Sequence, residues 1–459
     1  MSYRLVRALF RLSMRGFFRA VSLEGAQSIP RKGPVLFVSN HTNAFVDPLV
    51  LLTSIHRRIT LTAKATLTRN PLLSLVIRAM GVILFHRVED LGTGRGLETG
   101  KRQSRNSDAL AQCVRVLRGG GAVFVFPEGI SHSDPEMRPF RNGAARIVID
   151  YLKDAGAPAL TVVPVGLHYS AKDRWRSDAV ALVGAPTDAR MLAHQGDDPA
   201  MLTAVLRQRV EALTANFSSS EERDLITEAG WVLQYLPEGP LPLDREVGFD
   251  AAADVERVHR LQRGAHRLHE ADPALFASLT AETRSLVSEL RSLGVEPREV
   301  SLSMRLARAA LFVTRELEIL LVGAPLAMVG GFVHLAPYLL TRHLVRALSQ
   351  DEDHPASNAV FLSIPIFVAW WTGLAGLAFV VGTGWLPFVL LGAPFTGLVH
   401  LQYRDRAGGA LRRLRTFVLW WRRPDLRRTL EERLTAWQAH LLAAEATLPE
   451  PQIPALTDG

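Results

Sequence analysis

A histidine and an aspartate that follow a strand-like run are the residues of this sequence best suited to chemistry. The apolar run Val35 to Val38 leads to His41, and Asp47 stands just before Pro48, where an apolar helix-like run begins. Proline is well tolerated at the first helical position, so this spacing predicts Asp47 as the helix N-cap. Imidazole accepts a proton near neutral pH, and a carboxylate on its other nitrogen fixes the tautomer and stabilises the imidazolium. The pair predicts general-base chemistry in which the nucleophile is a hydroxyl group of the substrate.

An isolated pair of this kind also has a plainer interpretation. His41 could be a capping or core histidine, and Asp47 could do no more than cap the helix, because short polar pairs recur by chance. The residues at the other predicted strand ends therefore decide between the two interpretations.

The elements that would position the pair alternate between strands and helices up to about Pro186. Helical periodicity covers Leu110 to Leu117, after a predicted cap at Asn106 to Asp108, and Ile147 to Leu152, which Gly156 ends. Strand-like runs are Val35 to Val38, Ile59 to Ala63, Gly81 to Phe85, Ala122 to Phe126, Leu160 to Leu167 and Ala179 to Val183. This alternation predicts an α/β fold with a mixed or largely parallel sheet flanked by helices, in which ligands gather at the carboxyl ends of the strands.

Charged residues follow the other predicted strands. Arg87 follows the third run, and Glu128 follows the fourth, with Arg138 and Arg141 close behind it. Guanidinium groups bind phosphate oxygens bidentately, and a carboxylate such as Glu128 accepts a hydrogen bond from a glycerol-like hydroxyl. Each of these residues alone is compatible with a surface or turn position. Together, beside a His/Asp pair, they predict a binding site for a phosphorylated alcohol.

The composition restricts the class of protein further. The chain has 459 residues, which is long enough for two or three domains. Its single cysteine, Cys113, excludes an internal disulfide and a cysteine metal cluster and suits a reducing compartment. The net charge is +8, and five of the 53 basic residues are lysine. Trp420 and Trp421 lie among arginines next to apolar segments, which favours a lipid partner, and no nucleic-acid partner is expected.

The first residues of the chain have the pattern of a basic amphipathic helix. On a helical wheel, the arginines share a sector of about 120° and apolar residues occupy the remainder. These arginines are Arg4, Arg7, Arg11, Arg15 and Arg19. Because arginine recurs every three or four residues, the segment is not a secretory signal. We expect a helix that lies on an anionic membrane surface; the alternative is a surface helix packed on its own domain.

Two long uncharged segments lie in the last third of the chain. Ile319 to Leu340 has 22 residues without a formal charge, enough for one membrane crossing, and Ala359 to Tyr403 has 45, enough for two, with a turn at Gly382 to Pro387. The arginine-rich residues after Tyr403 are expected on the cytoplasmic face, together with the catalytic domain. The number of crossings is then even, so Ile319 to Leu340, which glycines and prolines weaken as a straight helix, is predicted to be shallow or re-entrant.

The sequence thus divides into five predicted parts. They are a basic amphipathic membrane-surface helix (residues 1–30), a catalytic domain (31–236), a helical region (243–315), membrane segments (319–403) and a basic C-terminal helical tail (404–459). We expect the helical region to be structural, because its charged amphipathic helices carry no recognisable chemistry.

Four short motifs resemble those of a known family, the phospholipid/glycerol acyltransferases. That family has the ordered motifs N-H-x-x-x-x-D, G-x-I-x-x-x-R, F-P-E-G-[ST]-R-S and [VI]-x-P-V. The matching residues here are Asn40-His41 to Asp47, Gly81 to Arg87, Phe126 to Gly129 and Val162 to Val165. The resemblance covers roughly residues 20–220, and four motifs in order are more specific than any single one.

The sequence departs from the common motifs in two places. Five residues separate His41 from Asp47, and Ile130-Ser131-His132 stands where the common form has Thr-Arg-Ser. Both departures, with the stretch that ends at Tyr169, resemble the branch that includes fungal glycerol-3-phosphate/dihydroxyacetone-phosphate acyltransferases. Arg138 or Arg141 would then replace the arginine of the third motif.

The resemblance implies a reaction and a set of site residues. His41 would deprotonate the acceptor hydroxyl, which attacks the thioester of an acyl-CoA or acyl carrier protein, while Asp47 orients the imidazole; neither a metal nor a cofactor is required. The implied substrate-binding residues are Asn43, Arg87, Glu128, Gly129, Ser131, Arg138 and Arg141.

The resemblance leaves several functions open. The expected function is a membrane-bound acyltransferase of phospholipid synthesis, with glycerol 3-phosphate or its 1-acyl form as the acceptor. The alternatives are a non-catalytic lipid-binding or membrane-remodelling protein on the same fold, and a thioester hydrolase that uses water.

Overall fold

The computed structural model describes residues 3–69, 71–86, 97–172, 174–193, 198–235, 250–348 and 355–447. The chain forms two units, each of which is described by itself. The first consists of Met1–Asn216 and Ala327–Leu401, and the second of Phe217–Leu326 and Gln402–Gly459. Two of the three boundaries between the units fall inside long helices, α12 (Leu306–Leu348) and α14 (Leu386–Arg422), and the third follows Asn216, outside any helix.

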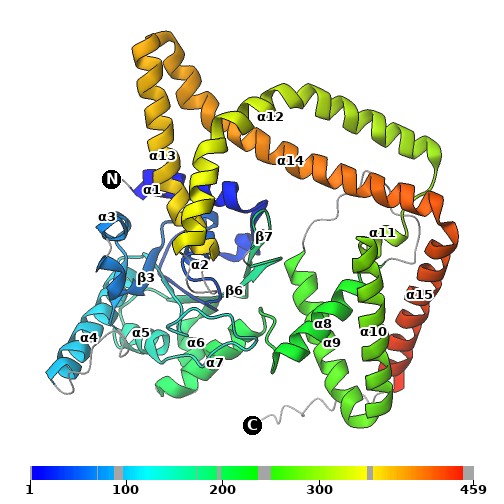
Figure 1. The fold of residues 1–459 in the computed structure, drawn as a ribbon. Helices are drawn as coiled ribbons and strands as arrows, with labels where there is room; N and C mark the ends of the chain where they lie inside the picture. The colour runs from blue at the N-terminus through cyan, green and yellow to red at the C-terminus, as the bar shows by residue number, and fades with distance from the viewer. Residues whose placement is uncertain are drawn as a thin grey trace. The chain divides into compact units, whose positions relative to one another are not determined.

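A mixed sheet forms the centre of the first unit (Figure 1). Its described strands are β1 (Ala20–Glu24), β2 (Val35–Ser39), β3 (Thr60–Lys64), β4 (Ile83–Phe85), β5 (Ala122–Val125), β6 (Thr161–Tyr169), β7 (Asp178–Val183) and β8 (Thr187–Asp188). The order is β1-β7-β6-β2-β5-β3-β4, with β8 beside β6. The strands from β6 to β4 in this order are parallel to one another, whereas β7 and β8 are antiparallel to β6. The predicted α/β fold with a largely parallel sheet is therefore confirmed.

Helices cover both faces of this sheet. They are α1 (Tyr3–Phe17), α2 (Val46–Ser54), α3 (Pro71–Met80), α4 (Leu97–Arg118), α5 (Gly143–Leu152), α6 (Ala189–Ala193) and α7 (Pro199–Glu211). Successive residues of β2 point to opposite faces, as the strand period requires. Val35 and Phe37 join the core of α1 and α2, while Leu36 and Val38 join the core of α4, α5 and α7. Burial on both sides fixes the register of β2 and hence the place where it ends.

The N-terminal helix packs on its own unit. It ends at Phe17 instead of continuing to Val21, because the chain joins the sheet at β1. The helix buries its apolar face, including Phe10. On its basic side, Arg7 donates to the carbonyl of Ile55 and Arg11 to that of Thr53, at 3.0 Å for the latter. These guanidinium groups satisfy carbonyls at the C-terminus of α2. The helix therefore packs on its own unit, and the prediction that it also lies on an anionic membrane surface stays a prediction.

The helix α4 begins before its predicted cap. Asn106 lies inside α4, which starts at Leu97. Its side-chain amide bonds to the backbone of His86, accepting from N–H and donating to C=O, both at 2.8 Å. The polar residues that suggested a helix start therefore serve a different purpose: Asn106 fixes the chain where it leaves β4.

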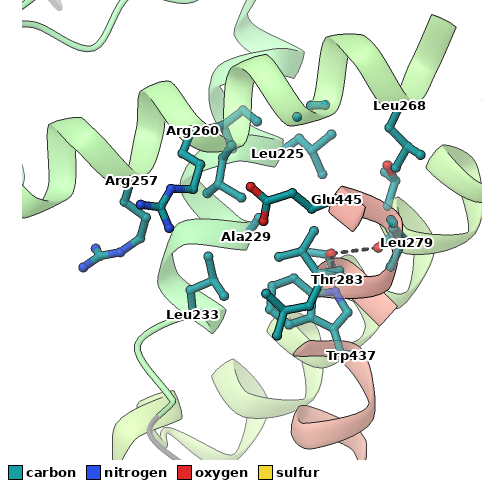
Figure 2. A pocket seen from close by; sticks show the side chains of 18 of the residues that line it. Leu225, Ala229, Leu233, Arg257, Arg260, Leu268, Leu279, Thr283, Trp437 and Glu445 are labelled. Carbon is teal, nitrogen blue, oxygen red and sulfur yellow. Dashed lines mark hydrogen bonds between the residues drawn. The ribbon is translucent and has the colours of Figure 1, made fainter. Parts of the chain in front are cut away.

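In its described residues, the second unit is helical; residues 243–249 of the predicted helical region lie outside them. Its helices are α8 (Ser220–Val232), α9 (Ala251–Ala271), α10 (Pro273–Leu293), α11 (Pro297–Val300) and α15 (Pro424–Thr447), with parts of α12 and α14. Side chains of Ser219, Asp250 and Asp272 cap α8, α9 and α10. A cavity of about 400 Å³, lined mainly by apolar side chains, lies between α8, α9, α10 and α15. Figure 2 shows residues that line it. At one side of it, the Trp437 indole donates to the Thr283 hydroxyl at 2.9 Å.

Two described helices are long and apolar enough to cross a membrane: residues Leu306–Ala347 within α12 and Ser357–Val381 within α13 (Pro355–Val381). The predicted turn at Gly382 to Pro387 is present, since α13 ends there and α14 begins at Leu386. The glycines of α12 do not interrupt it, contrary to our prediction of a weakened segment. A Cβ on Gly330 would lie 2.1 Å from the Thr396 carbonyl oxygen, so this glycine lets α12 and α14 approach closely.

Candidate active site

Asn40 ends β2 and directs the next residue out of the sheet. Its side-chain oxygen accepts from the Leu167 N–H at 2.8 Å, and its side-chain nitrogen donates to the Leu167 carbonyl at 3.2 Å. The side chain thereby takes the place of the β2 backbone in pairing with β6. The backbone after Asn40 is released from the ladder, and His41 stands on the turn that leaves the strand.

His41 and Asp47 form the predicted pair. The His41 Nδ1 lies 2.9 Å from Asp47 Oδ2, and the same oxygen accepts from the Asn43 N–H at 2.7 Å. The other carboxylate oxygen accepts from the Tyr169 hydroxyl, which comes from the end of β6. The Asp47 side chain is fully buried, while that of His41 is 14% exposed. A buried carboxylate with three donors is held in one orientation.

This arrangement determines which nitrogen of His41 can act as a base. An ionised carboxylate only accepts hydrogen bonds, so Nδ1 carries the proton and the lone pair lies on Nε2. Tyr169 remains a donor, because burial and then the neighbouring charge of Asp47 hold its pKa well above the usual range. In the described part of the chain, no hydroxyl or thiol is bonded to the His41 ring. The geometry fits a base that acts on a hydroxyl brought by the substrate.

Asp47 is not the helix N-cap. The helix α2 begins at Val46, its N-cap is Phe45, and Asp47 lies in the first turn. The helix starts earlier because the Val46 N–H and the Asp47 N–H both donate to the Asn43 carbonyl. The carboxylate is free of a capping role and turns back to His41.

Glu128 holds the backbone of His41. One of its oxygens accepts from the His41 N–H at 2.5 Å, and the other accepts from the Arg138 N–H at 2.9 Å and from the ring of His132. The Glu128 residue is only 2% exposed. These donors give Glu128 a positioning role toward His41. The prediction that Glu128 also accepts from a substrate hydroxyl stays a prediction, because a carboxylate has about four acceptor sites.

Gly129 and Arg141 lie against each other at the turn after β5. Gly129 has a φ of +73°, in the left-handed region that glycine adopts readily. A Cβ added to Gly129 would lie 3.0 Å from Nε of Arg141. The Arg141 guanidinium therefore covers the turn, while the Arg138 side chain extends to Asp134 at 2.8 Å. Of the two predicted replacements for the motif arginine, this placement favours Arg141.

The remaining predicted binding residues have different surroundings. Asn43 is fully buried and donates to the Lys172 carbonyl at 3.2 Å, which gives it a structural position next to Asp47. Ser131 is half-buried in the loop after β5. Arg87 lies outside the described residues, although β4, the strand before it, ends on the same edge of the sheet as β2. The prediction that Arg87 binds phosphate stays a prediction.

Sequence reasoning missed three contributors to this site. The Phe126 ring stacks on the His41 ring with centroids 4.2 Å apart, and His132 and Tyr169 bond to Glu128 and Asp47 respectively. His132 was noticed only as a departure from the common motif, and Tyr169 only as the end of an unusual stretch. One signal was available: these residues follow or end predicted strands, and the carboxyl ends of parallel strands meet at one edge of a sheet.

Comparison with known proteins finds similarity to acyltransferases, as the sequence motifs predicted. The family model described as Acyltransferase matches residues 20–168. The chain is similar to the 1-acyl-sn-glycerol-3-phosphate acyltransferase of Borreliella burgdorferi, with 26% identity over 150 residues, 32% of this chain and 54% of that protein. It is also similar to glycerol-3-phosphate O-acyltransferase 1 of Saccharomyces cerevisiae, with 24% identity over 248 residues, 38% of this chain and 33% of that protein. The chain spans about a third to a half of the length of these curated relatives.

A solved structure also matches part of the chain. The 1-acyl-sn-glycerophosphate acyltransferase from Thermotoga maritima has 20% identity and a TM-score of 0.33, and the match covers 47% of this chain and 82% of that one. The order of motifs predicted the same family from the sequence, and the family match lies on the elements that carry His41 and Asp47. Residues 20–168 of this chain are therefore similar to the domain that the Acyltransferase family model describes.

Proposed function

We propose that this protein is a membrane-bound O-acyltransferase that transfers a fatty acyl group from a thioester to glycerol 3-phosphate or 1-acyl-glycerol 3-phosphate. The observation that carries the proposal is the His41–Asp47 pair at 2.9 Å, with its buried carboxylate and its half-buried base. The acyl donor is an acyl-CoA or an acyl carrier protein. Two relatives named for glycerol-phosphate acyl transfer support the choice of acceptor.

The proposed reaction needs one base and no protein nucleophile. The acceptor hydroxyl gives its proton to Nε2 of His41 while its oxygen attacks the thioester carbonyl. The tetrahedral intermediate expels the thiolate, which takes the proton from the imidazolium. Asp47 stabilises the imidazolium through Nδ1. General-base action of this kind contributes roughly 10²- to 10⁴-fold to the rate, and substrate positioning contributes the rest.

The apolar helices support the membrane part of the proposal. Only 17% of the most apolar stretch of α12 and 6% of that of α13 are buried inside the protein. Exposed apolar helices of this length fit a lipid environment better than water. The arginine-rich residues after Tyr403 favour the cytoplasmic face for the tail, and the thioester donor requires the same face for His41.

The test compares wild type with His41→Ala in detergent or lipid vesicles. Wild type should release thiol from acyl-CoA only when a glycerol-phosphate acceptor is present, and His41→Ala should lose about 10²- to 10⁴-fold of this activity. The variant should fold, because Asp47 keeps Asn43 and Tyr169 as donors. Near-normal turnover by His41→Ala would refute the assignment. Free fatty acid without acceptor would indicate a hydrolase, and lipid binding without thioester cleavage would indicate a non-catalytic protein.

A further inference from the structure

The loop between His41 and Asp47 contacts a helix far away in the sequence. Phe45 lies in this loop, and its N–H donates to the Ser357 hydroxyl oxygen at 3.2 Å. Ser357 stands in the first turn of α13 and is 1% exposed. The loop residue two positions before Asp47 is thus tied to a helix that lies well outside the matched acyltransferase domain, residues 20–168.

Further contacts hold the start of α13 against the first unit. The Phe361 ring meets Phe45 edge to face, with centroids 4.6 Å apart, and meets Phe10 of α1 at 5.8 Å. Val360 is 1% exposed and belongs to the same core as β2 and α2. Ser13 of α1 donates to the Val360 carbonyl at 3.1 Å. The start of α13 is therefore part of the core under the catalytic loop, although the apolar window that follows is largely exposed.

The loop itself requires external support. Ala44 has a φ of +31°, which is uncommon for a residue with a Cβ and is retained only where the surroundings enforce it. The Asn43 side-chain oxygen is buried, and none of the residues that the structure describes donates a hydrogen bond to it. A loop with unfavourable backbone geometry and an unsatisfied polar atom tends to relax if its ties are removed. Such relaxation would move Asp47 relative to His41.

We propose that the first two turns of α13 are a positioning element of the active site. In this proposal, which rests on the proposed acyl transfer, Ser357 and Phe361 hold the loop between His41 and Asp47 in its active conformation. Acyl transfer then requires the base of this apolar helix to be docked on the acyltransferase domain. Ser357 is a positioning residue, since it accepts from the backbone of the loop that joins the two catalytic residues.

The test uses two serine-to-alanine variants of the full chain in lipid vesicles. Ser357→Ala removes the acceptor of the Phe45 N–H. The matched control Ser363→Ala removes a hydroxyl from the same helix, one whose described hydrogen bonds go to the Ser13 hydroxyl at 3.0 Å and to the Val360 carbonyl at 2.8 Å. Ser357→Ala should lower kcat about tenfold and leave KM for the thioester within about twofold, while the control stays within about twofold of wild type in both.

Hydrogen exchange gives a readout that does not depend on activity. Without substrate, the peptide that contains the Phe45 amide should exchange about tenfold faster in Ser357→Ala than in wild type, and Ser363→Ala should match wild type. If Ser357→Ala is not produced as a folded protein, Phe361→Leu replaces it, because this variant removes the aromatic ring and keeps an apolar side chain. It should show the same loss in kcat and the same faster exchange of the Phe45 peptide. Unchanged kcat and unchanged exchange in Ser357→Ala would overturn the proposal, as would equal losses in both serine variants. A wild type without acyl transfer would overturn the proposed function, and the exchange comparison would still decide whether α13 holds the loop.

Discussion

Replacing Asp47 by asparagine tests the assigned roles of the pair most sharply. The carboxylate accepts from His41 Nδ1, from the Asn43 N–H and from the Tyr169 hydroxyl. In Asp47→Asn, the amide oxygen can keep the first two donors while the amide nitrogen faces Tyr169. The Tyr169 hydroxyl can rotate and accept from that nitrogen, because it is both a donor and an acceptor. The variant should therefore fold and keep the tautomer of His41, but it removes the negative charge.

The size of the effect follows from the missing charge. An imidazolium and a carboxylate with charge centres ~4 Å apart attract each other by about 4 kcal/mol at an effective dielectric constant of ~20. The imidazolium exists only after the proton has moved, so this attraction stabilises the transition state and not the free enzyme. Each 1.36 kcal/mol corresponds to a factor of ten, so kcat should fall about 10³-fold.

The assay measures thiol release from acyl-CoA at saturating acceptor, with thermal unfolding of each variant in the same lipid. Asp47→Asn should combine the large loss in kcat with little change in KM and in Tm. Asp47→Ala is the contrasting variant, because it leaves three buried donors without an acceptor and should also lower Tm. Turnover by Asp47→Asn within tenfold of wild type would refute the role of the carboxylate charge.

Two further predictions concern buried groups near the sheet. His132→Gln should keep a donor for Glu128 and retain most of the activity, whereas His132→Ala should lose about 1–3 kcal/mol of stability and part of kcat; equal behaviour of the two variants would contradict the positioning role of Glu128. Burial raises the pKa of Cys113 to about 12, so the native protein should resist maleimide at pH 8 and react after denaturation, as mass spectrometry can show. Rapid labelling of the native protein would contradict the burial of this thiol. Because the pKa of Cys113 is higher in the folded than in the unfolded protein, its contribution to stability is complete below about pH 8.5 and declines as the pH rises toward 12.

The sequence was informative where function depends on short spacings. The strand runs, the His41–Asp47 pair and the turn after α13 follow from local periodicity and from residues a few positions apart. The pair could be predicted because a strand end and the next helix start are close neighbours in an α/β fold. The order of the motifs predicted a resemblance to the acyltransferases, and the family model matches residues 20–168.

The sequence was less informative where a polar side chain had several potential partners. Glu128 and Arg11 are of residue types that often face substrate or lipid, yet one bonds to the His41 backbone and the other to the end of α2. Asn106 has the composition of a helix cap but bonds to the chain leaving β4. Periodicity gives the direction of a side chain from its own element, and its partner depends on which other element is packed there. The contact between Phe45 and Ser357 joins residues 312 positions apart, beyond any local pattern.

The discontinuity of the first unit has a consequence for its synthesis. The ribosome completes the sheet by about residue 188, but Val360, which belongs to the core beneath α1 and α2, emerges much later. At ~5–20 residues per second, this interval lasts on the order of ten seconds or more. The core beneath α1 and α2 therefore receives one of its buried members, Val360, only after the whole sheet has been synthesised. We expect the loop between His41 and Asp47 to reach its final conformation only after the start of α13 has emerged.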